Sequence, residues 1–347
     1  DLWKSLGATF LAAETAANAH KPLPVYPAQR GLSSVAQQYL HAVVFSTSSM
    51  DSLMPLQIEL ADRLIAHFLS NFVLSPDCRP DSVYWVDAAS GSAPFRLARH
   101  PGTSRPGLRF FSPGKVPQAL DDLIHVVERG ELPPDLNLGG EHTQRVLLPV
   151  LRHLRVYWAM HPPQRRHRRH AVKTRMLVLR GFDESYTVFA GVHPSAASTP
   201  KVASWVVENV SLGGFRAYLD DAPELQVKLG ALLCAQPDGS GNWLLGVARR
   251  FNRIGGRRAS LGVQVLSRQA QSIELRPRRS GFSAAIAIPG IWLRDGGEAG
   301  VERILLPLGA FNVRESVEFS HDDRRYSLTP VELEETGADY EIGRFHG

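Results

Sequence analysis

The stretch HPPQRRHRRHAVKTRMLVL, residues 161–179, contains the change in pattern that decides the fold. Before it, apolar residues often recur at three- and four-residue steps, a spacing typical of amphipathic helices. After it, short apolar runs alternate with turn residues, as in antiparallel strands. Pro162 and Pro163 do not continue a helix, because proline lacks the amide donor and restricts the residue before it. The sequence therefore predicts a domain boundary at residue 161.

The residues before this boundary predict a mainly helical α+β domain over 1–160. Helical spacing is present from residue 2 to about 74, for example in 53–69, and again in 119–127 and 146–159. A short β-hairpin is indicated within 82–97, where two apolar runs flank a turn-rich segment.

The residues after the boundary predict two β units. Residues 161–270 contain many short strand-like runs with no obvious helix between them, which favours a small antiparallel barrel. These runs are 171–179, 185–190, 202–210, 215–219, 224–229, 243–251 and 261–266. Residues 271–347 predict a C-terminal β-rich domain packed on the barrel, with runs at 283–288, 303–306, 316–319, 326–328 and 340–345. The expected fold class is a multidomain α+β protein.

Composition agrees with an ordinary globular chain of two or three domains. The 347 residues are 44% hydrophobic and 21% charged, close to globular averages. Cys78 and Cys234 are far apart, so we expect neither a disulfide framework nor a zinc site. The longest apolar candidate, 284–293, is interrupted by Pro289 and is shorter than the ~20 residues of a membrane helix. We therefore expect no membrane span and a cytoplasmic location.

Positive charge is concentrated directly after the double proline. The net charge is only +5, but residues 165–180 hold no acidic side chain and seven basic ones: Arg165, Arg166, Arg168, Arg169, Lys173, Arg175 and Arg180. A guanidinium group donates in a fork that matches phosphate oxygens, stacks on purines and pairs with guanine. Four arginines within five positions, ahead of a strand, predict a segment that closes over an anion.

A second polar signal lies about 40 residues later, in Asn209-Val-Ser-Leu-Gly-Gly214. Here a predicted strand ends in small polar side chains and two glycines, Gly213 and Gly214. Glycine allows a ligand to approach the backbone closely, and Asn209 and Ser211 can hydrogen-bond guanine edges or phosphate.

Together these two segments resemble the PilZ family of cyclic di-GMP receptors. The family pattern is Arg-x-x-x-Arg before the first barrel strand, then Asp/Asn-x-Ser-x-x-Gly between later strands. Residues 165–169 and 209–214 match both halves in that order, and 261–266 resembles the family's closing strand. The resemblance covers 164–267, and the combination of motifs is more specific than either alone.

The resemblance implies a binding role for each motif residue. Arg165 and Arg169 would hold phosphates and guanines, Asn209 and Ser211 would contact guanine and the ligand backbone, and Gly214 would permit the turn. Arg166 and Arg168 are second candidates because the dense arginines leave the register open by one residue, and Gly213 belongs to the same turn. The implied ligand is cyclic di-GMP, often bound as an intercalated dimer. No further cofactor is implied.

Three functional classes remain to be distinguished. The leading hypothesis is a receptor in which the ligand changes interdomain arrangement or partner binding, with a protein partner on the N-terminal domain. A nucleic-acid-binding protein, using the same arginines and the basic run 249–258, is the alternative, and nucleic acid is the less expected ligand. The third is a PilZ-like scaffold without ligand. Homo-oligomerisation is left open.

Neither metal binding nor catalysis is expected from the sequence. His161, His167 and His170 lack metal-site spacing. Ser211 lacks the surroundings of a nucleophile elbow.

Overall fold

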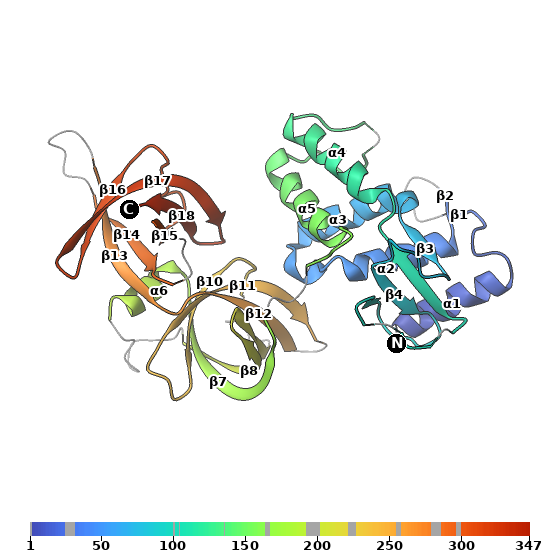
Figure 1. Ribbon diagram of the computed structural model, residues 1–347, viewed down its shortest axis with the longest axis horizontal. Coiled ribbons are helices and arrows are strands. Elements are labelled where there is room, and N and C mark those ends of the chain that lie inside the picture. The colour runs from blue at the N-terminus through green and yellow to red at the C-terminus, as the bar shows by residue number, and fades with distance from the viewer. Residues whose placement is uncertain are drawn as a thin grey trace. The chain divides into compact units, whose positions relative to one another are not determined.

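The computed structural model contains two compact units, Asp1–Gln164 and Arg165–Gly347, which Figure 1 shows as a helical and a β-rich part. It describes residues 2–24, 32–99, 101–103, 105–134, 136–163, 167–191, 202–220, 227–254, 258–278, 286–295 and 300–347. The predicted α+β class is confirmed, with helices concentrated in the first unit and strands in the second.

The N-terminal unit combines five α-helices with a small antiparallel sheet. The helices are α1 (Leu2–Thr15), α2 (Val35–Thr47), α3 (Pro55–Phe68), α4 (Val116–Glu128) and α5 (Gln144–Tyr157). Two 3₁₀ turns, Met50–Ser52 and Leu69–Asn71, flank α3. The sheet has the order β3-β6-β4-β5, formed by β3 (Val73–Ser75), β4 (Tyr84–Asp87), β5 (Phe95–Arg96) and β6 (Leu108–Ser112). The separate pair β1 (Leu23–Pro24) and β2 (Leu32–Ser33) follows α1.

Local sequence explains where two of these helices begin. Ser34 caps α2, its side chain accepting a hydrogen bond from the Gln37 amide at 3.2 Å. Pro55 occupies the first position of α3, where the missing amide hydrogen costs nothing.

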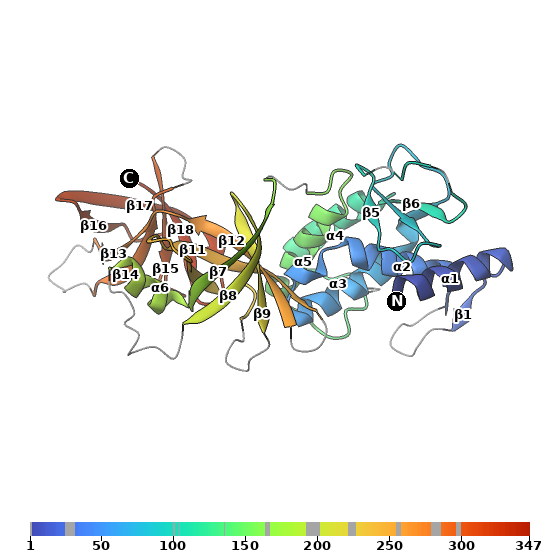
Figure 2. The same ribbon diagram turned by 90° about the horizontal axis from the view of Figure 1, so that it is seen from below.

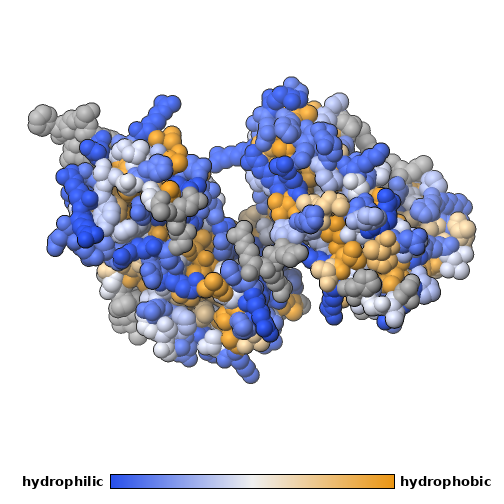
Figure 3. Space-filling model, in the orientation of Figure 1, coloured by the Kyte–Doolittle hydropathy of each residue, from blue (hydrophilic) through white to orange (hydrophobic). Residues whose placement is uncertain are grey.

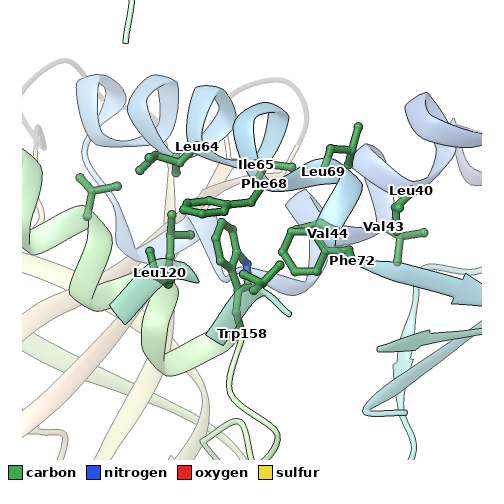
Figure 4. Close-up of a cluster of buried hydrophobic side chains, with 14 of the residues drawn as sticks. Leu40, Val43, Val44, Leu64, Ile65, Phe68, Leu69, Phe72, Leu120 and Trp158 are labelled. Carbon is green, nitrogen blue, oxygen red and sulfur yellow. The ribbon is translucent and has the colours of Figure 1, made fainter. Parts of the chain in front are cut away.

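Aromatic and aliphatic side chains form one core in this unit. Trp158, directly after α5, packs edge-on against Phe68 and Phe72, as Figure 4 shows. Its indole Nε1 donates to the Ser48 hydroxyl at 2.8 Å, so the buried polar atom is satisfied. The core thus draws α3, α5 and the end of α2 together. None of the helices among the described residues is long and apolar enough to cross a membrane.

The first half of the C-terminal unit is a closed barrel of six antiparallel strands. Around the ring the order is β10-β11-β12-β9-β8-β7. Its strands are β7 (His170–Arg180), β8 (Ala203–Ser211), β9 (Gly214–Asp220), β10 (Leu232–Pro237), β11 (Leu244–Arg253) and β12 (Arg258–Ser267). Trp205, Val207, Phe215 and Ala217 are among the side chains that fill its interior.

The sequence-based strand at 185–190 is wrong, because these residues lie in or directly after helix α6 (Phe182–Phe189). The helix begins after Gly181 and carries Asp183 and Glu184 in its first turn, where acidic side chains favour the helix dipole. The expectation that no helix interrupts the barrel strands is corrected accordingly. In the predicted run at 224–229, residues 224–226 lie outside the described residues, and the prediction is wrong for 227–229, which form no strand.

The second half of this unit is another closed antiparallel barrel, with the order β13-β14-β15-β18-β17-β16. Its strands are β13 (Ala270–Pro277), β14 (Ile288–Leu293), β15 (Val301–Leu306), β16 (Val317–His321), β17 (Arg324–Thr336) and β18 (Glu341–His346). In the predicted run at 283–288, residues 283–285 lie outside the described residues, 286 and 287 form no strand, and β14 begins at the last position, 288.

The two barrels share a buried cluster in which α6 takes part. Leu232 and Cys234 of β10 face this cluster, whereas Leu233 and Ala235 of the same strand face the interior of the first barrel. The second barrel contributes, among others, Ile291, Leu293, Leu305 and Ile342. Figures 1 and 2 show α6 beside the strands that it contacts, β7, β10, β13 and β14. One hydrophobic core therefore joins the barrels.

Candidate functional site

The second motif forms a tight hairpin between β8 and β9. Asn209 and Ser211 are near the end of β8, and Gly214 begins β9. Ser211 pairs with Gly214, so that only Leu212 and Gly213 form the loop. Two-residue loops hold antiparallel strands in a fixed register. The sequence motif is thus placed on a rigid corner of the first barrel.

Gly214 is required by the close approach of the neighbouring strand. A Cβ at this position would lie 2.1 Å from the backbone oxygen of Val263 in β12, which no side chain tolerates. The φ angle of Gly214 is +157°, outside the range that other residues usually adopt. Absence of a side chain therefore lets β9 and β12 meet at the motif corner.

Arg169 connects the arginine segment to this corner. Its Nη1 donates a hydrogen bond to Asn209 Oδ1 at 3.1 Å, across 40 residues of sequence. The contact follows from strand pairing, because β7 begins at His170 and its next residue, Ala171, pairs with Asn209. Arg169 is half-buried and Arg168 is exposed. Arg165 and Arg166 lie outside the described residues.

His167 extends this contact to the loop itself. A Cβ at Gly213 would lie 3.2 Å from Cδ2 of the His167 ring. The imidazole therefore lies against the loop, and the small size of Gly213 makes room for it. Residues 167–169 thus follow the surface of the hairpin.

The hairpin is held from several directions. The Ser211 hydroxyl donates to the Gly214 carbonyl at 3.0 Å, and the Val265 amide donates to the Gly213 carbonyl at 3.0 Å. Arg268 Nη2 donates to the Leu212 carbonyl at 2.5 Å. Since the loop carbonyls are occupied, the corner is preorganised, and Ser211 can accept but not freely donate a hydrogen bond.

The charge of the corner is mixed rather than purely basic. Asn209 Nδ2 donates to Glu208 Oε2 at 3.3 Å, and Arg216 Nη1 lies 3.6 Å from the same oxygen. The hydrogen bond with Glu208 also raises the pKa of Tyr218. An incoming anion would compete with Glu208 for these donors, because phosphate accepts the same charge-assisted hydrogen bonds.

Two contributors to the corner were missed by sequence reasoning. His167 was considered only as a metal ligand, although its position inside the arginine run offered a signal. Arg268 is 56 residues from Leu212, and nothing in the local sequence indicates that contact. Both side chains contribute to the corner because the fold places them next to it.

The structure also describes the cysteines and potential metal ligands. Cys78 is exposed, Cys234 is buried, and both are free. Burial raises the pKa of the Cys234 thiol to about 12, which disfavours the reactive thiolate. Within the described part of the chain, no three His, Cys, Asp or Glu side chains are grouped to hold a metal ion.

Fold and corner together define an α+β protein with paired β-barrels and an Arg/Asn surface site. In a comparison with known families, residues 1–79 match the family described as "Cyclic-di-GMP receptor FimW, N-terminal domain". This match lies in the helical unit, outside the segments that carry the PilZ resemblance. Nothing matches among the curated proteins or among the solved structures.

Proposed function

We propose that the protein is a cyclic di-GMP receptor whose ligand binds at the β8–β9 corner of the first barrel. The observation that carries this proposal is the hydrogen bond between Arg169 and Asn209. It brings the two motif halves, predicted separately from sequence, to one place. The match of residues 1–79 to the N-terminal domain of a cyclic-di-GMP receptor family supports the same ligand independently.

The proposed binding mode uses the chemistry of each group. Arg168 and Arg169 supply guanidinium donors to phosphate or to guanine O6 and N7, with Arg165 and Arg166 from the same segment. Asn209 and Ser211 contact a guanine edge or the sugar-phosphate backbone, while Gly213 and Gly214 keep the corner accessible. Charge-assisted hydrogen bonds contribute about 1.5–3 kcal/mol each, so a few can support micromolar affinity.

We further propose that binding acts as a signal and not as a step in catalysis. The arginine segment directly precedes β7 and follows the N-terminal unit, so ligand contacts there can change interdomain arrangement or partner binding. Hydrophobic residues gather on the visible face of the N-terminal unit in Figure 3, which favours a protein partner there. We place this receptor in the cytoplasm.

Calorimetric titration with cyclic di-GMP tests the site. Wild type should bind, and Arg169→Ala and Asn209→Ala should each lose about tenfold to a hundredfold in affinity, as expected for one charge-assisted contact. Lys115→Ala is a control that removes a cation from the N-terminal unit, and it should bind like wild type. Equal affinity in wild type and all three variants would show that the ligand does not bind at this corner.

Salt dependence separates this function from nucleic-acid binding. Binding of DNA or RNA through the basic surface would weaken steeply with salt and would respond to many arginines, but hardly to Asn209→Ala. A chain that binds neither cyclic di-GMP nor another cyclic dinucleotide, judged by unchanged melting temperature, would instead be a scaffold.

The signalling step has a separate test at Cys78. Because Cys78 is exposed and Cys234 is buried, a fluorophore can be attached selectively at Cys78. With a second label on an introduced cysteine at Ser240, in the turn after β10, energy transfer should change when cyclic di-GMP binds wild type. It should stay constant in Arg169→Ala at the same ligand concentration. A constant signal in ligand-saturated wild type would contradict a change in interdomain arrangement.

A further inference from the structure

The corner continues into a row of side chains on the outer face of the first barrel. Asn209 of β8 pairs with Arg216 of β9, Arg216 pairs with Gly262 of β12, and Gly262 pairs with Arg250 of β11. Residues paired directly across antiparallel strands point to the same face. The next row, Val207, Ala217 and Leu261, is fully buried inside the barrel. The row that starts at Asn209 therefore faces outward.

Gly262 makes room for the Arg250 side chain in the middle of this row. A Cβ there would lie 3.1 Å from Cβ of Arg250 and within 3.7 Å of its Cγ and Cδ. The aliphatic stem of Arg250 therefore lies against Gly262, in the place that a side chain would otherwise fill. No side chain of β12 separates Arg250 from Arg216 in this row.

Arg216 is positioned to exchange partners. Its guanidinium lies 3.6 Å from Glu208, and the two side chains are 40% and 37% exposed. Ion pairs that are this exposed contribute little, because water screens them. A phosphate with two acceptor oxygens can therefore replace the carboxylate at Arg216 at small cost.

The span of the row suits a ligand larger than one nucleotide. From β8 to β11 there are three strand spacings of about 4.8 Å each. Arg169 and Asn209 meet at one end, while Arg216 and Arg250 add guanidinium groups toward the other. A ligand with two phosphates and two bases can contact both ends simultaneously.

We propose that Arg216 and Arg250 extend the ligand site across the outer face of the barrel and bind the half of cyclic di-GMP that Arg169 and Asn209 do not hold. This inference rests on the function proposed above. In this arrangement Arg216 contacts one phosphate, and Arg250 contacts the other phosphate or a base at the far end of the row. Gly262 is assigned the role of making room for the aliphatic stem of Arg250.

Glutamine substitutions test this extension without introducing a cavity. Arg216→Gln and Arg250→Gln should each weaken cyclic di-GMP binding about tenfold in calorimetry, as expected for one lost charge-assisted contact. Arg250→Lys should retain part of the affinity. Arg253→Gln is the matched control: it makes the same charge change on the same strand, at an exposed residue paired with Ala259 outside the row. It should bind within about twofold of wild type.

GMP, which corresponds to half of the ligand, distinguishes the loss of a direct contact with Arg250 from a general structural effect of the substitution. Binding of GMP, detected by NMR titration, should be weakened by Asn209→Ala and changed little by Arg250→Gln. Melting temperatures of Arg250→Gln and Arg253→Gln without ligand are measured alongside, so that a change in stability is separated from a change in binding. Loss of GMP and cyclic di-GMP binding to the same extent in Arg250→Gln would overturn the extension.

The remaining outcomes distinguish this inference from the proposed function. Suppose that wild type binds cyclic di-GMP and Asn209→Ala does not. If Arg216→Gln and Arg250→Gln, the row variants, then bind with the same affinity as Arg253→Gln, the extension is wrong and the receptor function stands. If Arg253→Gln weakens binding as much as the row variants, the arginines act only through overall charge and the extension is also wrong. If wild type does not bind cyclic di-GMP, the proposed function itself fails.

Discussion

At the scale of one residue, Gly214 shows how a missing side chain shapes the proposed site. The Val263 carbonyl occupies the space where a Cβ would lie, so the corner geometry depends on this glycine. Gly241 offers a contrast, because a Cβ there would have no heavy atom within 4 Å. A comparison of the two positions therefore distinguishes a glycine that packing requires from one that only adds backbone flexibility.

Gly214→Ala should lower the free energy of unfolding by about 1–3 kcal/mol, the usual cost of forcing extra volume into a packed region. Cyclic di-GMP affinity should fall with it, because β9 must move away from β12. Gly241→Ala should change stability by less than about 0.5 kcal/mol. Urea denaturation of both variants checks this, and equal midpoints would contradict the close packing at Gly214.

At this scale, part of the proposed site could be predicted from the sequence, and the rest depends on contacts that only the fold creates. Arg169 and Asn209 carry distinctive chemistry in a recognisable order, so both could be nominated before their contact was seen. Arg268 could not, since only the folded barrel brings it to the Leu212 carbonyl. Arg216 and Gly262 likewise gain significance only from the strand register.

At the scale of elements, the periodicity of apolar residues failed to predict α6 and β10. Residues 185–190 include aromatic and β-branched side chains and were predicted as a strand, but burial of Phe182, Ser185 and Val188 at three-residue steps reveals a helix. β10 is buried on both faces, so its Leu-Leu-Cys-Ala run lacks the alternation that identifies a half-buried strand. Tertiary burial outweighed local pattern in both elements.

Phe182→Ala should loosen both barrels together. Phe182 is 5% exposed in the shared cluster, and truncating such a side chain costs about 3–5 kcal/mol. Amide hydrogen exchange should therefore accelerate in β10 as well as in β14. Phe319→Ala, in the separate core of the second barrel, should accelerate exchange in β16 and β17 more than in β10. Unchanged exchange in β14 of Phe182→Ala would exclude the joint role of α6.

At the scale of the whole C-terminal unit, a polar chain also crosses between the barrels. Gln264, the partner of Gly214 in β12, accepts a hydrogen bond from Arg249 Nε at 2.8 Å. Arg249 Nη2 donates to Glu335 Oε2 of the second barrel at 2.6 Å, and Tyr340 Oη donates to the other oxygen of Glu335. Burial raises the pKa of Glu335, but hydrogen bonds from Arg249 and Tyr340 outweigh burial, and the net pKa is lowered.

This lowered pKa gives the ion pair a defined pH dependence. A carboxyl group whose pKa falls on folding stabilises the folded state above its ordinary pKa, here 4.5. The contribution is lost as the pH falls through the lower value of the folded protein. Glu335→Gln should therefore cost about 1–2 kcal/mol at pH 7, a range reduced because both side chains are partly exposed.

The difference between wild type and Glu335→Gln should shrink when urea denaturation is repeated at about pH 3. Glu332→Gln provides the control, because Glu332 lies on the same strand in a more exposed pair with Arg344. It should cost less at pH 7. A pH-independent cost at Glu335 would show that the carboxylate charge is not what stabilises the pair.

The core shared by the barrels has a practical consequence for dissecting the protein. A fragment that ends after Ser267 would leave Leu232, Cys234, Leu245 and Val247 facing water, although each is fully buried in the intact unit. Such a fragment should aggregate during expression even if its motif residues are all present. Investigators who want the proposed ligand site alone should therefore truncate ahead of the arginines and retain everything downstream.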